Sequence, residues 1–257
     1  MTYNVHRCRG LDRRWSPARI ARVIDICRPD IVALQELDVG RVRSGQVDQA
    51  QTIARHLAMD VHFFPALKVL DELYGDAVLS RWPMRLKKAE GLPGYPRIRG
   101  LEPRGALWAE IEVASTRVQL INTHLGILGA ERRKQVAALL GPDWLGHADC
   151  TPPAVLVGDF NATPQSRSYA ALRRRLRDVQ RSQAGGRNNA TFPTRYPTLA
   201  LDHIFVSADI QVIDSFAVRS ALARVASDHL PLMAELRLPP RQIETRDLRH
   251  ARQVEVQ

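Results

Sequence analysis

The sequence predicts an α/β fold in which two β-sheets pack face to face and helices cover their outer faces. Three observations predict it: apolar runs of strand length occur in both halves of the 257-residue chain, helical patterns lie between them, and no linker or repeat divides the halves. A chain of this length in such a fold can form one domain. We therefore expect one domain over residues 1–238, followed by a polar, disordered tail over residues 239–257.

The first half of the chain alternates between short strands and capped helices. Ser16 before Pro17 predicts a helix start, because serine caps a helix N-terminus and proline is favoured at its first position. Pro29 ends that helix, and Asp48 predicts the cap of a second one. The strands expected in this half are residues 2–5, 31–34, 77–79, 106–113 and 118–122.

The second half of the chain is rich in β-strands. A helix is expected over residues 129–140, and a basic helix over residues 168–176. Two further segments, residues 91–105 and 184–197, are rich in turn-forming residues and long enough to be binding loops. The strands expected in this half are residues 154–157, 201–206, 211–218 and 230–236.

The composition is that of a globular protein with a strong positive charge. Hydrophobic residues make up 45% and charged residues 25%, which excludes a mostly disordered, collagen-like or fibrous chain. Lys+Arg number 37 against 27 Asp+Glu, a formal net charge of +10, and all but four of the 37 are arginine. This bias has two explanations: the codon usage of a GC-rich genome, or a phosphate-rich partner, because guanidinium groups match phosphate oxygens.

The cysteines and the N-terminus predict a cytoplasmic protein. Cys8, Cys27 and Cys150 are far apart and lack C-x-x-C spacing, so free thiols are expected rather than disulfides or a zinc site. The first ten residues lack the apolar core of a signal peptide, and no apolar run is long enough to span a bilayer. The first expected strand starts directly after Met1, which leaves open whether Met1 is the true start.

Polar side chains stand where the apolar strands begin or end. One such residue is most often a cap or a solvated rim residue, but several at strand ends that converge on one edge predict a cleft. Carboxylate and amide oxygens suit Mg²⁺ or Mn²⁺, and histidines paired with carboxylates can move protons, as phosphate ester hydrolysis requires. The residues are Asn4, Gln35-Glu36, Asn122-Thr123-His124, Asp159-Phe160-Asn161, Asp202-His203 and Ser227-Asp228-His229.

Seven segments in this order resemble the endonuclease/exonuclease/phosphatase (DNase I-like) superfamily. The resemblance covers residues 2 to about 236, and its specificity comes from the whole set rather than from any one segment. It implies a four-layer α/β sandwich with the site at one end of two packed sheets. The segments are Thr2-Tyr3-Asn4, Gln35-Glu36, Gly75 to Arg81, Asn122 to Leu125, Gly158 to Asn161, Leu201 to Phe205 and Ser227-Asp228-His229.

The resemblance also implies a metal site. Glu36 would be the main ligand of Mg²⁺ (or Mn²⁺), with Asn4 and Asp228 completing or supporting the metal shell. Asp159 and Asn161 would position the attacking water and a phosphoryl oxygen.

The histidines take the proton-transfer roles in this resemblance. His229, paired with Asp202, would activate water or stabilise the phosphorane, and His124 would donate a proton to the leaving group or bind phosphate. Which histidine is acid and which is base stays open. Arg81 is a candidate phosphate clamp, with a surface arginine as the alternative.

The substrate is not fixed by the fold, and four hypotheses remain. We expect a phosphodiesterase acting on a phospholipid headgroup, a small phosphodiester or a nucleic acid. A nuclease is supported by arginines in loops 7–14 and 97–104 and in segment 173–177, although a solvated helix face also explains the last. The others are an inositol- or sugar-phosphate phosphomonoesterase and a non-catalytic nucleic-acid-binding protein.

A second resemblance suggests a small phosphodiester or a phospholipid headgroup as the substrate. Glu36-Leu37-Asp38, followed by Arg41, Arg43, Asp48 and Gln49, resembles a branch of small bacterial members similar to the domain of GPI-anchor lipid-remodelling proteins. A basic surface would also suit peripheral contact with an anionic membrane. No protein partner can be inferred from the sequence.

Overall fold

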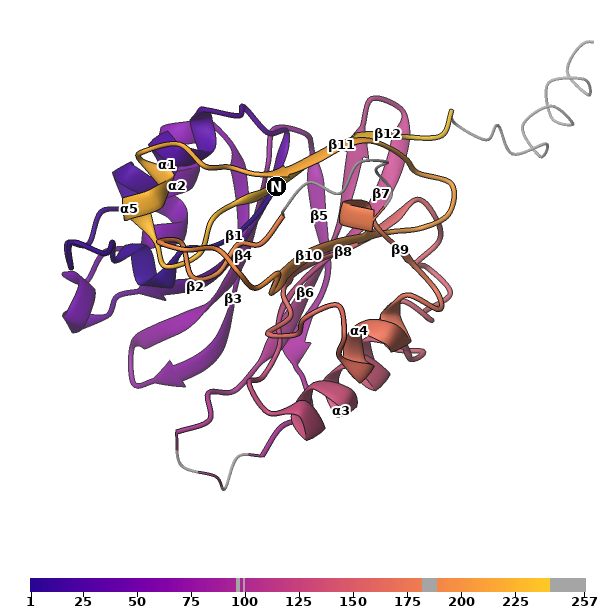
Figure 1. The fold of residues 1–257 in the computed structure, drawn as a ribbon, viewed down its shortest axis with the longest axis horizontal. Helices are drawn as coiled ribbons and strands as arrows, with labels where there is room; N and C mark the ends of the chain where they lie inside the picture. Colours follow the sequence, from indigo (N-terminus) through magenta and orange to yellow (C-terminus); the bar gives the residue numbers. More distant parts are fainter. Residues whose placement is uncertain (96–97, 99, 182–188, 241–257) are drawn as a thin grey trace, which may run out of the picture.

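The two predicted sheets are present, each with six strands. The structure is a computed structural model that describes residues 1–95, 98, 100–181 and 189–240 (Figure 1). The first sheet has the order β11-β12-β1-β2-β4-β3, in which β1 and β2 are parallel and the other pairs antiparallel. Its strands are β1 (Thr2–Asn4), β2 (Ile31–Val39), β3 (Asp60–Val69), β4 (Glu72–Ser80), β11 (Gln211–Ala217) and β12 (Leu232–Arg237).

The second sheet has the order β5-β6-β7-β8-β10-β9, with β7 and β8 parallel. Its central strands are buried along their length, as the apolar runs in the sequence require. Its strands are β5 (Met84–Gly91), β6 (Gly105–Val113), β7 (Thr116–His124), β8 (Ala154–Asp159), β9 (Arg177–Asp178) and β10 (Asp202–Val206).

Helices cover the outer faces of both sheets, which gives four layers and confirms the predicted sandwich. One cluster of buried side chains joins the first sheet to its helices, a second joins the second sheet to its helices, and a third fills the space between the sheets. The helices on the first sheet are α1 (Pro17–Asp25), α2 (Gln49–Leu57) and α5 (Ala223–Ala226); those on the second are α3 (Gly129–Leu140) and α4 (Arg167–Leu172) (Figure 1). Three short 3₁₀ turns complete the described elements: η1 (His6–Cys8), η2 (Val42–Ser44) and η3 (Val179–Arg181).

The predicted helix caps are confirmed. The Ser16 hydroxyl accepts a hydrogen bond from the backbone N–H of Arg19 at the start of α1, with Pro17 at the first position. The Asp48 carboxylate accepts one from Gln51 at the start of α2. The basic helix expected over residues 168–176 is shorter, since α4 ends at Leu172 and β9 begins at Arg177.

Three strands were not predicted, β3, β5 and the two-residue β9, and all three lie at sheet edges. β3 contains Pro65 beside an irregularity in its pairing, and β5 carries several charged side chains on an exposed edge. An edge strand tolerates proline and charge because one side of it forms no ladder hydrogen bonds. Such strands therefore lack the apolar run by which interior strands are recognised.

Other sequence predictions have mixed outcomes. The three cysteines are free thiols, as predicted. No helix in the described part of the chain is long and apolar enough to cross a membrane. The tail predicted over residues 239–257 lies outside the described residues from residue 241 onward, as do residues 97 and 99 of the predicted arginine loop, so both stay predictions.

A buried amide joins the two sheets beneath the strand ends that carry the polar residues. Asn122 on β7 donates hydrogen bonds to the backbone carbonyls of Leu34 and Ala77 across the interface, at 3.0 and 2.9 Å. Its own carbonyl accepts a hydrogen bond from Gln35 at 2.8 Å. All of these side-chain groups are buried, so their hydrogen bonds have no competition from water.

Replacing Asn122 with alanine should lower the free energy of unfolding by about 2–4 kcal/mol, because it leaves buried polar groups without partners. Urea unfolding followed by circular dichroism measures this change. The control is Gln51→Ala, an exposed position in α2, which should change stability by less than about 0.5 kcal/mol. Equal stability of the two variants would show that Asn122 does not tie the sheets together.

Candidate active site

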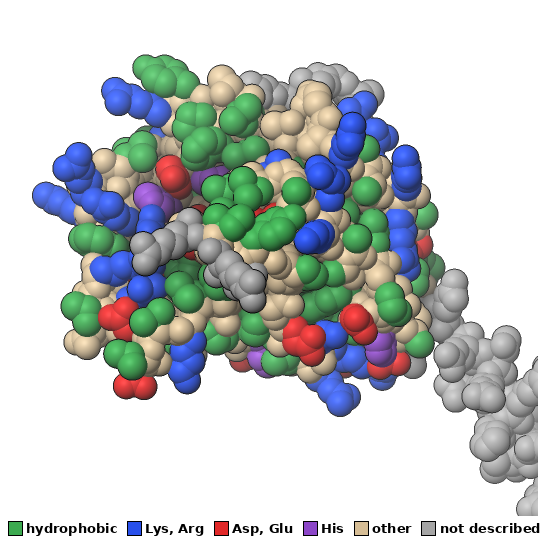
Figure 2. Space-filling model, turned by 90° about the horizontal axis from the view of Figure 1, so that it is seen from below, with side chains coloured by type: hydrophobic (Ala, Val, Ile, Leu, Met, Phe, Trp, Pro, Cys, Tyr) green, Lys and Arg blue, Asp and Glu red, His purple; other side chains and the backbone are tan. Residues whose placement is uncertain are grey.

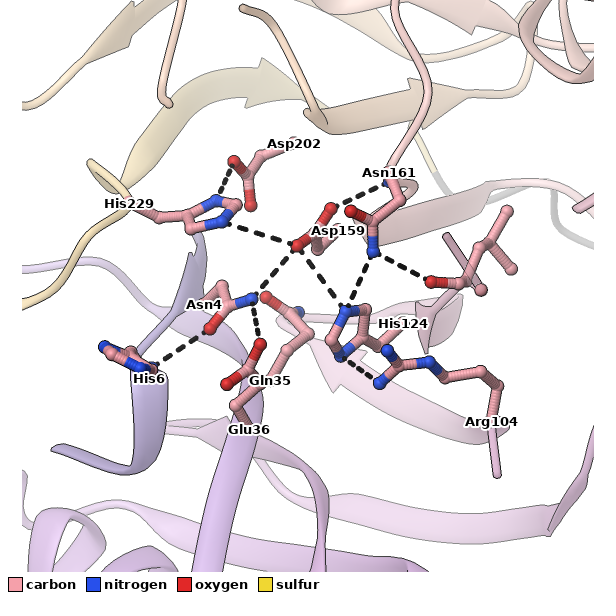
Figure 3. A network of polar contacts seen from close by, with 12 residues as sticks. Asn4, His6, Gln35, Glu36, Arg104, His124, Asp159, Asn161, Asp202 and His229 are labelled. Carbon is pink, nitrogen blue, oxygen red and sulfur yellow. Dashed lines mark hydrogen bonds and ion pairs between the residues drawn. The ribbon is translucent and has the colours of Figure 1, made fainter. Parts of the chain in front are cut away.

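The predicted polar residues meet at one end of the sandwich, where β1, β2, β7, β8 and β10 place their ends side by side (Figure 3). In the parallel pair β7–β8, His124 lies in register with Asp159, and in the antiparallel pair β8–β10, Asp159 lies in register with Asp202. Strand pairing alone therefore brings together three residues that are far apart in the sequence. We call this group of side chains the catalytic cluster: Asn4, Glu36, Asp76, Arg104, His124, Asp159, Asn161, Asp202 and His229.

A bulge in β2 directs Glu36 toward the cluster. The pairing of β2 with β4 shifts between Leu34 and Leu37, so Gln35 points into the core while Glu36 is only half-buried. Glu36 has a φ of +61°, a left-handed conformation that costs about 1–3 kcal/mol in a non-glycine residue. On the neighbouring strand, Gly75 lets β3 and β4 approach closely, because a Cβ there would meet the Phe64 carbonyl oxygen at 1.9 Å. Asn161 of the cluster also has a positive φ, of +46°.

Asn4 links the two sheets at the centre of the cluster. Its Nδ2 donates to Glu36 Oε1 and to Asp159 Oδ2, each at 3.0 Å, and its Oδ1 accepts from the backbone N–H of His6 at 3.0 Å. The two carboxylates therefore converge on one amide group. Asp159 also accepts a hydrogen bond through Oδ1 from the backbone N–H of Asn161 at 2.8 Å.

Asp202 and His229 form the pair that the resemblance implied. His229 Nδ1 lies 2.8 Å from Asp202 Oδ2, and the same oxygen accepts a hydrogen bond from the Thr191 hydroxyl at 2.5 Å. The ring packs against Phe192, and its Nε2 lies 3.7 Å from Asp159 Oδ2. Burial disfavours the imidazolium, but the carboxylates of Asp202 and Asp159 outweigh it and raise the pKa of His229 to about 10. His229 is therefore positively charged at neutral pH.

The surroundings of His124 have the opposite effect on the charge of its ring. Burial and the neighbouring Arg104 guanidinium lower the pKa of His124 well below its ordinary value, so the ring is neutral. The Arg104 guanidinium can only donate, and it lies 3.1 Å from His124 Nδ1. Nε2 lies 3.6 Å from Asp159 Oδ2 and 3.1 Å from the Asn161 side-chain amide. The two histidines thus differ in charge and approach Asp159 from different sides.

The carboxylates of the cluster are crowded and incompletely neutralised. Burial raises the pKa of Asp159 to about 6, against the opposing effect of the charged His229. Burial also raises the pKa of Asp76 to about 7, although Arg104 opposes that shift. The Asp202 Oδ1 atom is buried and has no hydrogen-bond partner among the described residues. A bound cation would give this buried oxygen a partner.

The donor set fits a divalent metal ion. Ligand atoms of Asp159, Asp202 and His229 lie within 4.8 Å of one another, although His229 could bind a metal only after losing a proton. Glu36 faces Asp159 across the Asn4 amide. Carboxylate and amide oxygens are the donors that Mg²⁺ and Mn²⁺ prefer. Asp228 lies at the border of the cluster, where its Oδ1 is 3.7 Å from His6 Nδ1. Its supporting role, like the metal-ligand role of Glu36, stays a prediction.

Arg81 does not belong to the cluster, so the structure gives no support to its predicted role as a phosphate clamp at this site. It follows Ser80, which pairs with Ile31 at the start of β2, the end of the sheet away from Glu36. Its guanidinium donates instead to the carbonyls of Pro29 and Leu57, at 3.3 and 3.4 Å. Arg81 therefore links the segment before β2 to the end of α2, at the opposite end of the sandwich from the cluster.

Several residues of the cluster had no role assigned from the sequence. Arg104 was noted only as a loop arginine, yet it precedes β6 in the way that the other polar residues flank their strands. Asp76 lies inside a segment that carried the resemblance, and its Oδ1 accepts from the backbone N–H of Glu36 at 3.4 Å. Thr191 comes from the predicted loop 184–197 and had no sequence signal of its own.

Other predicted surface features have structural partners. Arg43 forms two hydrogen bonds to Asp38, at 2.9 and 2.6 Å, so this pair stabilises the segment after β2. Arg175 donates to the carbonyls of Leu140 and Leu145, which supports a structural explanation for that arginine of the basic run. These residues give no direct evidence for a substrate.

Arg104 should act as a positioning residue for His124. Arg104→Met removes a hydrogen bond and a positive charge, so the His124 pKa should rise and kcat/KM should fall by about tenfold to a hundredfold. Histidine-ring NMR titration and initial rates measure the two effects. Arg81→Met is the matched control and should leave both unchanged, whereas equal effects of the two substitutions would contradict the role of Arg104.

The fold and the cluster define a DNase I-like protein: a sandwich of two mixed sheets with carboxylates, amides and two histidines at one end. The sequence model of the Endonuclease/Exonuclease/phosphatase family matches residues 1–229. The chain belongs to this family, which includes metal-dependent phosphoesterases, nucleases and phosphatases, and whose members are typically hydrolases.

Alignments with individual relatives cover nearly the whole chain. The Uncharacterized protein YbhP of Escherichia coli K12 is 27% identical over 249 residues, which is 93% of this chain and 95% of that protein. A family member from Beutenbergia cavernae is similar in structure, with a TM-score of 0.75 and 22% identity over 93% of this chain and 70% of its own. A mannosyl-6-phosphatase from Bacteroides thetaiotaomicron has a TM-score of 0.70 and 20% identity, with coverage of 92% and 98%. The two structures at these identities support the fold alone.

Proposed function

We propose that the protein is a divalent-metal-dependent phosphodiesterase that hydrolyses a P–O bond. The observation that carries the proposal is the contact chain from Asp202 through His229 to Asp159, which sets a charged histidine beside a carboxylate of raised pKa. A diester is favoured over a monoester because a monoanion suits an acid-rich cluster better than a dianion. A nuclease and a phosphomonoesterase are the alternatives, and a non-catalytic nucleic-acid-binding protein fits the cluster least.

Residues of the cluster have separate roles in hydrolysis. Asp159 is placed to accept a proton from the attacking water, since its pKa is near neutrality and Asn4 and Asn161 fix its orientation. His229, held and kept charged by Asp202, donates a proton to the leaving oxygen as the bond to phosphorus breaks. His124 and Asn161 hold the phosphoryl oxygens.

A bound Mg²⁺ or Mn²⁺, held by Glu36 with Asn4 and Asp228 in support, would neutralise the phosphate charge and polarise the P–O bond. The products are a phosphomonoester and an alcohol, and one water is consumed. A cytoplasmic location remains our expectation from the free thiols.

A ³¹P NMR time course tests the proposal. Purified protein with Mg²⁺ would be given a DNA oligomer, a glycerophosphodiester and an inositol monophosphate, with an EDTA-treated sample as the control. We expect loss of the glycerophosphodiester signal and a new monoester signal, both blocked by EDTA. Loss of the DNA or monoester signal instead would favour the corresponding alternative. No change in Mg²⁺ or Mn²⁺ would contradict catalysis by this chain.

A further inference from the structure

Exposed apolar side chains concentrate on the loops at the end of the sandwich that carries the catalytic cluster. In the described part of the chain, all large hydrophobic residues that are exposed lie on or beside these loops except Ile26, Leu86 and Ile213. Leu70 at the tip of the β3–β4 hairpin is 87% exposed and Val42 is 70% exposed. Around the hollow where histidine and acidic side chains are visible, hydrophobic and basic side chains are interspersed (Figure 2). This distribution is not that of singly scattered surface residues.

One group of these residues forms a continuous patch, which we call the arginine–tryptophan patch: Leu11, Arg13, Arg14, Trp15, Arg224 and Val225. The backbone N–H of Leu11 donates to the Val225 carbonyl at 3.0 Å, which joins the loop after η1 to α5. Leu11, Trp15 and Val225 are 46%, 43% and 42% exposed, and the three arginines are exposed as well. The patch is thus built from two segments that the fold holds together.

The patch lies beside the catalytic cluster in the fold. Its first segment follows directly from Asn4 through η1, where the His6 backbone bonds the Asn4 side chain. Its second segment, in α5, leads directly into Ser227, Asp228 and His229. A surface that bound the patch would therefore lie close to the mouth of the site.

The positive charge of the patch is not neutralised by its acidic neighbour. Asp12 stands between Leu11 and Arg13, but its carboxylate forms two hydrogen bonds, at 2.7 and 3.0 Å, with Arg19 of α1. The guanidinium of Arg9 stacks over the Trp15 ring, 5.1 Å from its centroid, and adds to the charge beside it. The patch therefore combines apolar side chains with unneutralised arginines, which is the composition of a membrane-surface contact.

We infer that the arginine–tryptophan patch binds the surface of an anionic lipid bilayer and presents the catalytic cluster to phospholipid headgroups. Tryptophan and aliphatic side chains gain free energy at the headgroup–acyl boundary, and arginines are attracted to anionic lipids. A nucleic acid would also attract the arginines, but its polar backbone offers little to Leu11, Val225, Val42 or Leu70. The bilayer contact is inferred from the residues of the arginine–tryptophan patch. The substrate class, a phospholipid phosphodiester, rests on the proposed function.

Vesicle co-sedimentation at physiological ionic strength tests the inference. The vesicles would contain phosphatidylcholine alone or with about one third phosphatidylglycerol. The test variant carries Leu11→Ser, Trp15→Ser and Val225→Ser, and the matched control carries Ile26→Ser, Leu86→Ser and Ile213→Ser, which are comparably exposed but lie away from the cluster. We expect binding to anionic vesicles to weaken by roughly tenfold or more in the test variant only.

Hydrolysis assays separate the inference from the proposed function. Both variants should hydrolyse soluble bis(p-nitrophenyl) phosphate as the unmodified protein does, while only the test variant should lose activity on phospholipid in vesicles. If the unmodified protein fails to bind anionic vesicles, or if both variants lose binding equally, the inference is wrong. Binding of a duplex DNA oligomer that is tighter than vesicle binding and is lost in the test variant would assign the patch to nucleic acid instead. Absence of soluble hydrolysis with vesicle binding intact would contradict only the proposed function.

Discussion

Replacing His229 with alanine should lower kcat by about 10²–10⁴-fold. His229 is the charged group of the cluster that can give a proton to the leaving oxygen, and the carboxylates of Asp202 and Asp159 hold it in that state. Without it, the leaving oxygen must depart with its negative charge. Initial rates with a glycerophosphodiester, whose alkoxide leaving group needs a proton, in saturating Mg²⁺ measure the loss.

The control for this prediction is His56→Ala, because His56 is exposed on α2 and far in the fold from the cluster. His229→Asn keeps a donor for Asp202 and should be as inactive as the alanine variant, so lost activity in both with unchanged thermal unfolding points to chemistry. An alanine variant that retained more than a tenth of the activity would remove His229 from the mechanism.

Interior strands could be predicted from the sequence because burial on both faces selects continuous apolar runs. Residues 31–34 and 154–157 are such runs, and they lie in β2 and β8 at the centres of the two sheets. β3 and β5 could not be predicted, because their edge positions accept Pro65 and a run of charged residues. The extension of β2 past Leu34 was also missed, since the polar Gln35 and Glu36 belong to a bulge that only pairing with β4 reveals.

The catalytic cluster was predictable where its residues end strands. Asn4, His124 and Asp159 occupy such ends, and strand pairing brings them together without contributions from distant loops. Arg81 and Arg104 show the limit of this argument. Both flank strands, but Arg81 follows the end of β4 away from the site and Arg104 precedes the end of β6 within it. Which of the two arginines lies at the site depends on the direction of its strand in the sheet, and the sequence alone does not give that direction.

Removing the metal should abolish hydrolysis, and Glu36→Gln should reproduce most of that loss. The substitution keeps the shape of the side chain and its contact with Asn4 but removes the negative charge that a divalent cation requires. We expect kcat to fall by about 10²-fold or more and the Mg²⁺ concentration for half-maximal rate to rise roughly tenfold. Activity after EDTA treatment and readdition of Mg²⁺ or Mn²⁺ measures both effects.

Glu112→Gln on β6 is the matched control, because its carboxylate is exposed and it pairs with Arg117 in the ladder, away from the cluster. It should keep full activity and the same response to Mg²⁺. Glu36 has a left-handed backbone that costs free energy, and the β2 bulge holds its side chain toward the cluster. If Glu36→Gln stabilises the protein and leaves the metal response unchanged, the strain serves another purpose, and Asp159, Asp202 and His229 become the candidate ligands.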